Sequence, residues 1–189
     1  MELIVRAVDV GSGNTKFVTG VTGADIRCAS FPSIAYPSSG ETPHWPASER
    51  RKTVCIPVGP LFYEVGPDVG LAADTFRAKQ LHDEYTESPE YTALLRGALS
   101  MMKVPHIDLL IVGLPVALFS LKKSALEKAM VGEHQVGGGK SVTVAWPSVR
   151  CSRCCRSRKI FRTQCVSFPK SLNPMVRRRW LRSAVAAWR

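Results

Sequence analysis

The chain has 189 residues, of which 45% are hydrophobic, and its formal net charge is +11. This length suits one ordinary domain or two small lobes, and the apolar content excludes a wholly disordered protein. No secretory signal is recognisable, because Glu2 and Asp9 interrupt the first apolar run, and the cysteines do not form a secreted framework. The cytoplasm is therefore the expected compartment.

The positive charge is unevenly distributed. Residues 1–140 hold 14 basic and 15 acidic residues, a net charge of −1, whereas residues 141–189 hold 12 basic and no acidic residues. Four of the six cysteines and three of the four tryptophans also lie after residue 140. Two different kinds of sequence are thus joined near Ser141.

β-Strands dominate the first third of the chain. Residues 2–10 and 14–21 predict two strands around a short turn, and residues 25–36 predict a third strand with a bend at Pro32. Residues 37–52 are polar and rich in Pro and Ser, which indicates a mobile surface loop. Two further strands, at 53–59 and 61–66, flank a turn at Gly59-Pro60.

Helices enter in the second half. Ser88-Pro89 is typical of a helix start, and Val104-Pro105 predicts its end. Between them, apolar residues recur at helical spacing and predict one buried face: Tyr91, Leu94, Leu95, Ala98, Leu99 and Met102.

The remaining elements complete an α/β pattern. Residues 107–114 predict a central strand, residues 121–130 a second helix, and residues 141–145 one more strand. The apolar stretch 109–121 contains Gly113 and Pro115 and is too short to cross a bilayer, so we expect a buried strand there and no membrane span.

The turn after the first strand carries the strongest functional signal. Gly11 and Gly13 can adopt backbone angles closed to other residues, which would let successive amides point into one anion-binding concavity. Ser12 and Thr15 add hydroxyl donors, and Lys16 adds a positive charge suited to phosphate.

Asp9 ends the preceding strand and would repel a phosphate unless a divalent cation lay between them. Mg²⁺ keeps several waters and needs only one or two carboxylates. The pattern therefore predicts a strand–turn–strand site for Mg-nucleotide. A plain hairpin whose Asp9 faces solvent fits the same residues.

The spacing Asp9-x-Gly11-Ser12-Gly13-x-x-Lys16 resembles the first phosphate-binding loop of the actin/Hsp70/sugar-kinase ATPase superfamily. Three later stretches, "GPLFYEVGPDVGLA", "DLLIVGLPVALFS" and "LKKSALEKAM", are similar to bacterial and plasmid actin-like proteins. The likeness covers residues 3–144. It is greatest to plasmid-segregation proteins of the ParM/StbA type, in particular PRTRC-system protein D.

The resemblance implies an actin-like (ribonuclease-H-like) N-terminal domain over residues 1–145, with a mixed sheet, two main helices and an outer-lobe insertion at about 35–85. It implies that Asp9 holds Mg²⁺ through water and that the loop grips the phosphates of ATP. The residues of this loop are Gly11, Ser12, Gly13, Asn14, Thr15 and Lys16. It also implies nucleotide-driven self-association into filaments that segregate plasmids, with a plasmid-partition adaptor as a possible partner.

The second lobe of the superfamily has no counterpart here. That lobe supplies another Asp-containing phosphate loop and an adenosine motif, yet no Asp or Glu follows Glu133. Because phosphoryl transfer needs charge stabilisation from both sides of the phosphates, we expect a truncated chain that binds ATP and Mg²⁺ weakly and is deficient in hydrolysis.

The basic tail, residues 146–189, has three interpretations. It can be a frameshifted or non-homologous end. It can hold zinc through four thiols, although their spacing fits poorly: Cys151, Cys154, Cys155 and Cys165. Alternatively, an amphipathic helix after Asn173-Pro174 can bind nucleic acid or an anionic membrane, which gives the chain a different function.

Overall fold

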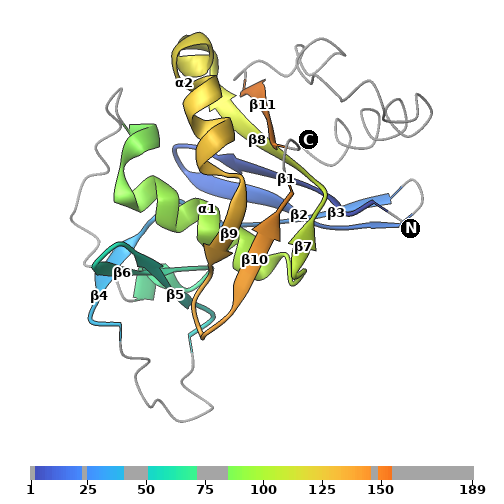
Figure 1. Ribbon diagram of the computed structural model, residues 1–189. Helices are drawn as coiled ribbons and strands as arrows, with labels where there is room; N and C mark the ends of the chain where they lie inside the picture. Colours follow the sequence, from blue (N-terminus) through green and yellow to red (C-terminus); the bar gives the residue numbers. More distant parts are fainter. Residues whose placement is uncertain (1–2, 23–24, 41–50, 72–84, 146–148, 155–189) are drawn as a thin grey trace.

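The computed structural model describes residues 3–22, 25–40, 51–71, 85–145 and 149–154 (Figure 1). Most of the polar loop predicted at 37–52 lies outside these residues. So do residues 155–189, and with them Cys155, Cys165 and the segment for which a basic helix was an alternative.

A mixed sheet forms the centre of the molecule, as predicted, and it has five strands (Figure 1). The strands, in spatial order, are β11 (Val149–Cys154), β8 (Leu109–Pro115), β1 (Val5–Val10), β2 (Asn14–Thr22) and β3 (Asp25–Pro32). β1, β2 and β3 are antiparallel neighbours, whereas β8 runs parallel to β1 and β11 runs parallel to β8. The sequence did not predict β11, which lies beyond the expected boundary at residue 145.

Side chains alternate between the two faces of this sheet because successive residues of a strand point to opposite sides. Val8, Val10 and Phe17 belong to the large core that includes helix α1 (Pro89–Met101). Ala7 and Val18 belong to a second, smaller apolar cluster. The two faces are thus distinguishable residue by residue, which fixes the side on which Asp9 lies.

Helix α1 begins where the sequence predicts. The Ser88 hydroxyl accepts a hydrogen bond from the Tyr91 amide at 3.1 Å, and Pro89 occupies the first helical position. The apolar stripe is buried against the sheet, with Leu94, Leu95 and Leu99 almost fully inaccessible. The predicted buried face is therefore confirmed.

Helix α2 (Val116–Ala129) starts earlier than the predicted residue 121. Residues 116–121, expected to continue the buried strand, are instead its first turns, and Leu121 is exposed. Pro115 explains the change, because proline has no N–H to extend a strand ladder and its φ of −55° suits a helix start. The apolar content of this segment hid the boundary.

Two small sheets complete the fold. One has the order β4 (Tyr36–Ser38), β6 (Leu61–Val65), β5 (Val54–Val58) and lies within the segment expected as the outer-lobe insertion. The other has the order β7 (His106–Ile107), β10 (Ser141–Val144), β9 (Gly132–Gln135), and of these β9 was not predicted. Single 3-10 turns occur at η2 (Val69–Leu71) and η3 (Tyr85–Glu87).

Within the described ranges, no helix has both the length and the apolar character needed to cross a membrane.

Candidate functional site

Asp9 lies in the central strand of the sheet with a polar neighbour on one side and a glycine on the other. It is directly opposite Lys16 in the antiparallel β1–β2 pair and level with Gly113 in the parallel β1–β8 pair. Only 9% of Asp9 is exposed, so the alternative in which it faces solvent is wrong. A carboxylate held this deep in a sheet requires a compensating partner.

Gly113 makes room for this carboxylate. A Cβ atom added at Gly113 would lie against the Asp9 carboxylate, 2.9 Å from its Cγ. No real Cβ approaches another carbon so closely, so any larger residue at this position would force Asp9 to move. The Gly-Leu-Pro at the end of β8 thus has a steric role at the site that sequence reasoning did not assign to it.

The turn itself differs from expectation in its backbone. Gly11 and Gly13 can adopt backbone angles closed to other residues, but neither has a φ in the left-handed region, so such angles do not shape this turn. The Gly11 amide is also used within the hairpin, where it donates to the Asn14 carbonyl at 3.1 Å. A Cβ at Gly11 would lie 3.0 Å from that same oxygen, so Gly11 is needed for close approach of the backbone.

Gly13 has a different character. The residue is exposed, its φ is ordinary, and nothing lies within 4 Å of where its Cβ would be. The fold therefore has no steric use for a glycine here. Ser12 and Asn14 on either side are also exposed, so the tip of the hairpin presents backbone and small polar groups to solvent.

The Thr15 side chain lies on a different face of the sheet from the side chains of Asp9 and Lys16. It alternates with Lys16 along β2 and so points to the α1 face of the sheet, where it is fully buried. Its hydroxyl lies 2.9 Å from that of Ser33, which is also buried. The Thr15 side chain therefore contacts Ser33 on the face of the sheet opposite Asp9.

Lys16 is exposed on the Asp9 face of β2. The charge of Lys16 acts on the Cys28 thiol of the neighbouring strand β3. Partial burial raises the pKa of this thiol, and the Lys16 ammonium opposes that shift. The structure therefore brings Asp9, the exposed tip at residues 12–14 and Lys16 to one end of the β1–β2 pair, with Asp9 and Lys16 directly opposite each other in the strand register.

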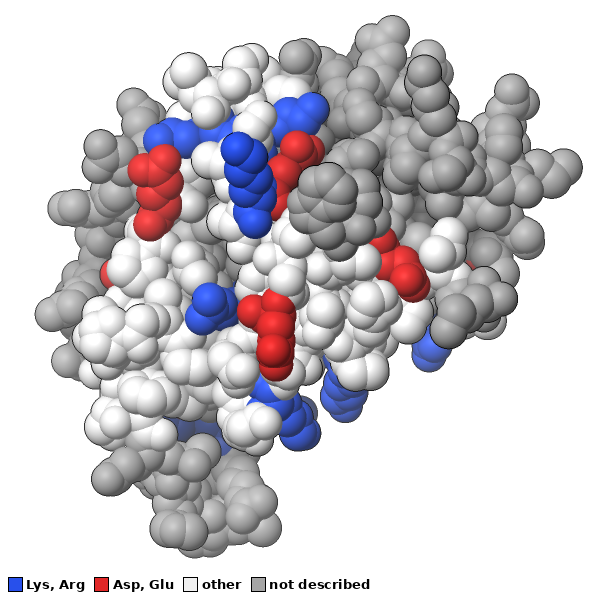
Figure 2. All heavy atoms as spheres, viewed as in Figure 1, with Lys and Arg blue, Asp and Glu red and all other residues white. Residues whose placement is uncertain are grey.

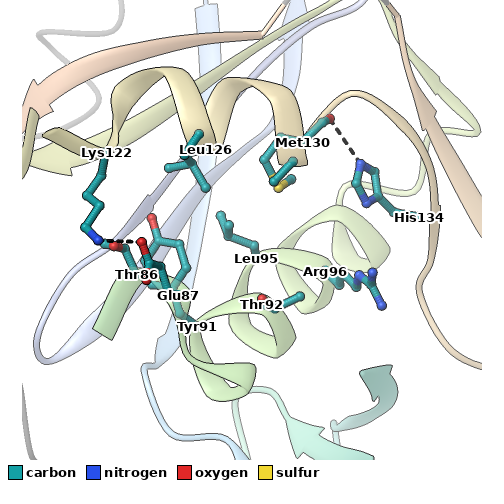
Figure 3. Close-up of a pocket in the computed structure, with 12 residues that line it drawn as sticks. Thr86, Glu87, Tyr91, Thr92, Leu95, Arg96, Lys122, Leu126, Met130 and His134 are labelled. Atoms are coloured by element: carbon teal, nitrogen blue, oxygen red, sulfur yellow. Dashed lines mark hydrogen bonds and ion pairs between the residues drawn. The ribbon is translucent and has the colours of Figure 1, made fainter. Parts of the chain in front are cut away.

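A pocket of about 260 Å³ lies elsewhere, between α1 and α2 (Figure 3). An ion pair between Glu87 and Lys122 spans one end of it, and near the other end buried His134 donates from Nε2 to the Met130 carbonyl at 3.0 Å. The helices that line it pack on the face opposite Asp9. This pocket is separate from the candidate phosphate site.

The face of the molecule shown in Figure 2 has its described charges intermixed, with lysines and arginines beside acidic residues rather than gathered in one basic patch. Across the described ranges, no three His, Cys, Asp or Glu side chains cluster so as to hold a metal ion.

The structure combines a mixed sheet whose first two strands form a glycine hairpin, a buried aspartate at the end of the first strand, and a small outer sheet inserted after the third strand. These features together define an actin-like domain. In agreement, the family described as "Actin like proteins N terminal domain" matches residues 7–151. The chain belongs to this family. The match ends inside β11, so it includes sequence beyond the boundary expected at residue 145.

Solved structures with the same fold include AlfA in a filament bound to AMPPNP, which is 18% identical with a TM-score of 0.54 and is matched over 80% of this chain and 55% of that one. A non-polymerisable quadruple mutant of pCBH ParM gives 18% identity and a TM-score of 0.56, over 83% and 48% of the two chains. An archaeal actin homolog gives 20% and 0.53, over 80% and 45%.

The chain thus spans about half the length of these structures. At such identities the likeness establishes the fold alone. No curated protein matches the sequence.

Proposed function

We propose that this chain is the Mg-ATP-binding N-terminal domain of a cytoplasmic actin-like filament protein. One observation carries the proposal: the buried Asp9 carboxylate is held between Gly113 and Lys16 at the base of an exposed glycine hairpin. The combination suits a metal-bound phosphate, because it offers a carboxylate for the hydrated metal and an ammonium for the phosphate oxygens.

The residues have distinct roles in this proposal. Asp9 holds Mg²⁺ through water, and Lys16 contacts the phosphates. The backbone of the hairpin lines the phosphates, with the absent side chain of Gly13 leaving room for them; the residues concerned are Gly11, Ser12, Gly13, Asn14 and Thr15. When bound, Mg²⁺ would supply the positive charge that lets a carboxylate and a triphosphate share one site.

Gly13 supports this assignment independently. A glycine that the backbone and the surrounding atoms do not need has another use, and close approach of a ligand to the main chain is the usual one. AMPPNP, which is bound in the AlfA filament, is a triphosphate analogue held by a protein of the same fold.

The direct test is a titration of the full chain with Mg-ATP, followed by amide NMR signals. We expect the largest shifts at residues 11–16, with none near the α1–α2 pocket. Lys16→Gln is expected to weaken binding, whereas Lys123→Gln, which removes an equal charge from α2, is expected to leave it unchanged. Mg-ATP without effect on residues 11–16 would refute the proposal.

We further propose that this chain does not turn ATP over by itself. Residues 134–189 contain no acidic residue, so they cannot supply the carboxylate of a second phosphate loop. Phosphate release should therefore stay at the background rate under conditions where binding is saturated. Release at many times background that Asp9→Ala abolishes would show that the first loop is sufficient.

For the wider role we propose nucleotide-dependent filament assembly in plasmid segregation, in the manner of ParM/StbA proteins and PRTRC-system protein D, with a partition adaptor as partner. The outer sheet β4–β6–β5 supports self-association, since Leu61 and Phe62 at its hairpin are 51% and 38% exposed. Sedimentation with Mg-AMPPNP tests this, and Leu61→Glu is expected to reduce the pelleted fraction. Equal pelleting with and without nucleotide would contradict it.

A further inference from the structure

We propose that Ser33 is a positioning residue for the nucleotide hairpin: it fixes the conformation of residues 13–15 without touching the nucleotide. The inference rests on the proposed function, since it names what sets the geometry of that same site. Ser33 lies outside the glycine motif, in the short connection between β3 and β4, and sequence reasoning assigned it no role.

Two hydrogen bonds join Ser33 to the hairpin, at both ends of a three-residue segment. Its amide donates to the Gly13 carbonyl at 2.9 Å, and its hydroxyl lies 2.9 Å from the Thr15 hydroxyl. Ser33 is 2% exposed and Thr15 is fully buried, so water does not compete for either group. The segment between these two anchors includes Asn14 and leads directly into Lys16.

The anchor lies directly beside the exposed hairpin tip, next to the strand pairs Val10–Thr15 and Asn14–Pro32 at the base of the hairpin. Residues 12–14 are exposed, and nothing approaches the open side of Gly13. A loop that is already held in its bound shape does not pay an ordering cost when ligand arrives, and it binds more tightly for that reason. Ser33 holds this loop from the opposite face of the sheet, where it leaves the phosphate side clear.

Removing the hydroxyl alone also affects folding, because it leaves the Thr15 hydroxyl buried without its partner. A loss of affinity in Ser33→Ala would therefore be ambiguous by itself. Replacing both partners with apolar groups of similar shape is close to neutral for stability. The double variant Thr15→Val/Ser33→Ala thus separates the two effects: it should regain thermal stability while the hydroxyl anchor at Thr15 stays absent and only the bond from the residue 33 amide to the Gly13 carbonyl remains.

The experiment compares the full-length wild type, Ser33→Ala and the double variant, with Ser38→Ala as the matched control on β4. Each is titrated with Mg-ATP, and its melting temperature is measured without nucleotide. We expect Ser33→Ala to weaken binding by about threefold to tenfold, the range of one hydrogen bond. The double variant should bind as weakly but melt nearer to wild type. Ser38→Ala removes a hydroxyl that accepts from the Gly40 amide and the Cys55 thiol, away from the hairpin, and should match wild type in affinity.

Wild-type affinity in Ser33→Ala, or affinity that recovers together with stability in the double variant, would overturn the role of Ser33 and leave the proposed function intact. If Ser33→Ala does not fold, the double variant decides: wild-type affinity there overturns the inference. Failure of the wild-type chain to bind Mg-ATP would overturn both.

Discussion

Asp9 and Gly113 lie level with each other in the parallel β1–β8 pair, so close that a Cβ at residue 113 would lie 2.9 Å from Asp9 Cγ. β1 and β8 thus contribute to one site, although more than a hundred residues separate Asp9 from Gly113 in the sequence. The glycine in Gly-Leu-Pro is required by the carboxylate beside it.

Replacing Gly113 with alanine should displace Asp9 and weaken Mg-ATP binding by about tenfold or more, the scale of a charge-assisted contact. Titration calorimetry measures the change. Gly70→Ala is the matched control, because nothing lies within 4 Å of its added Cβ and its φ is ordinary. Unchanged affinity in Gly113→Ala would mean that the position of Asp9 is not critical.

Gly13→Ala should separate binding from folding. The added methyl group meets no atom of the chain and no forbidden backbone angle, so the melting temperature should stay within about 1–2 °C of wild type, as for a neutral surface change. Affinity for Mg-ATP should fall, because the same methyl group occupies the space assigned to phosphate. Preserved affinity would remove the ligand-based reason for this glycine.

Strand β11 is expected to stabilise the domain. It pairs with β8 in register from Val149–Leu110 to Cys154–Pro115, and Val149 is only 2% exposed. A chain that ends at residue 145 should therefore melt roughly 5 °C below one that ends at residue 154, since it loses a buried side chain and leaves β8 as an open edge. Equal melting temperatures would place the domain boundary at residue 145, as the sequence predicts.

His134 should make stability depend on pH. Burial lowers the pKa of His134 below its ordinary value; the hydrogen bond to the Met130 carbonyl opposes this shift, and the Arg96 charge adds to it. Because the unfolded chain binds the proton more readily, stability is greatest above the unfolded pKa of about 6.5 and falls as the pH drops below it.

Thermal melts between pH 7.5 and 5 measure this dependence. His134→Gln should flatten the curve, whereas His106→Gln, at a half-exposed position beside Asp108, serves as the control for losing a histidine. A curve that keeps its slope without His134 would assign the effect to another group.

Local sequence patterns predicted most of the helices and strands, because these elements depend on interactions between residues that are close in the sequence. The cap at Ser88-Pro89 and the helical spacing of the apolar residues after it both describe interactions within a few positions. The start of α2 was misplaced because residues 116–121 are apolar yet mostly exposed, so composition indicated burial that the fold does not provide. β9 and β11 were missed because they carry charged or polar residues and are defined by pairing with distant strands.

The candidate site shows the same limit. Asp9 and the hairpin are one continuous motif, which made them visible in the sequence. Gly113 and Ser33 contribute through contacts that form only in the folded chain, and the spacing of residues in the sequence does not predict these contacts. Thr15 was included because hydroxyls bind phosphate, but strand alternation turns its side chain to the other face.

The most direct measurement is the affinity of the full chain for ATP with Mg²⁺ and with excess chelator, in the wild type and in Asp9→Asn. Asparagine keeps the size of the side chain and removes its charge. We expect the wild type to bind at least about tenfold more tightly with Mg²⁺, and Asp9→Asn to lose that difference. Equal dependence on Mg²⁺ in both proteins would contradict the assignment of Asp9 as the metal-holding carboxylate.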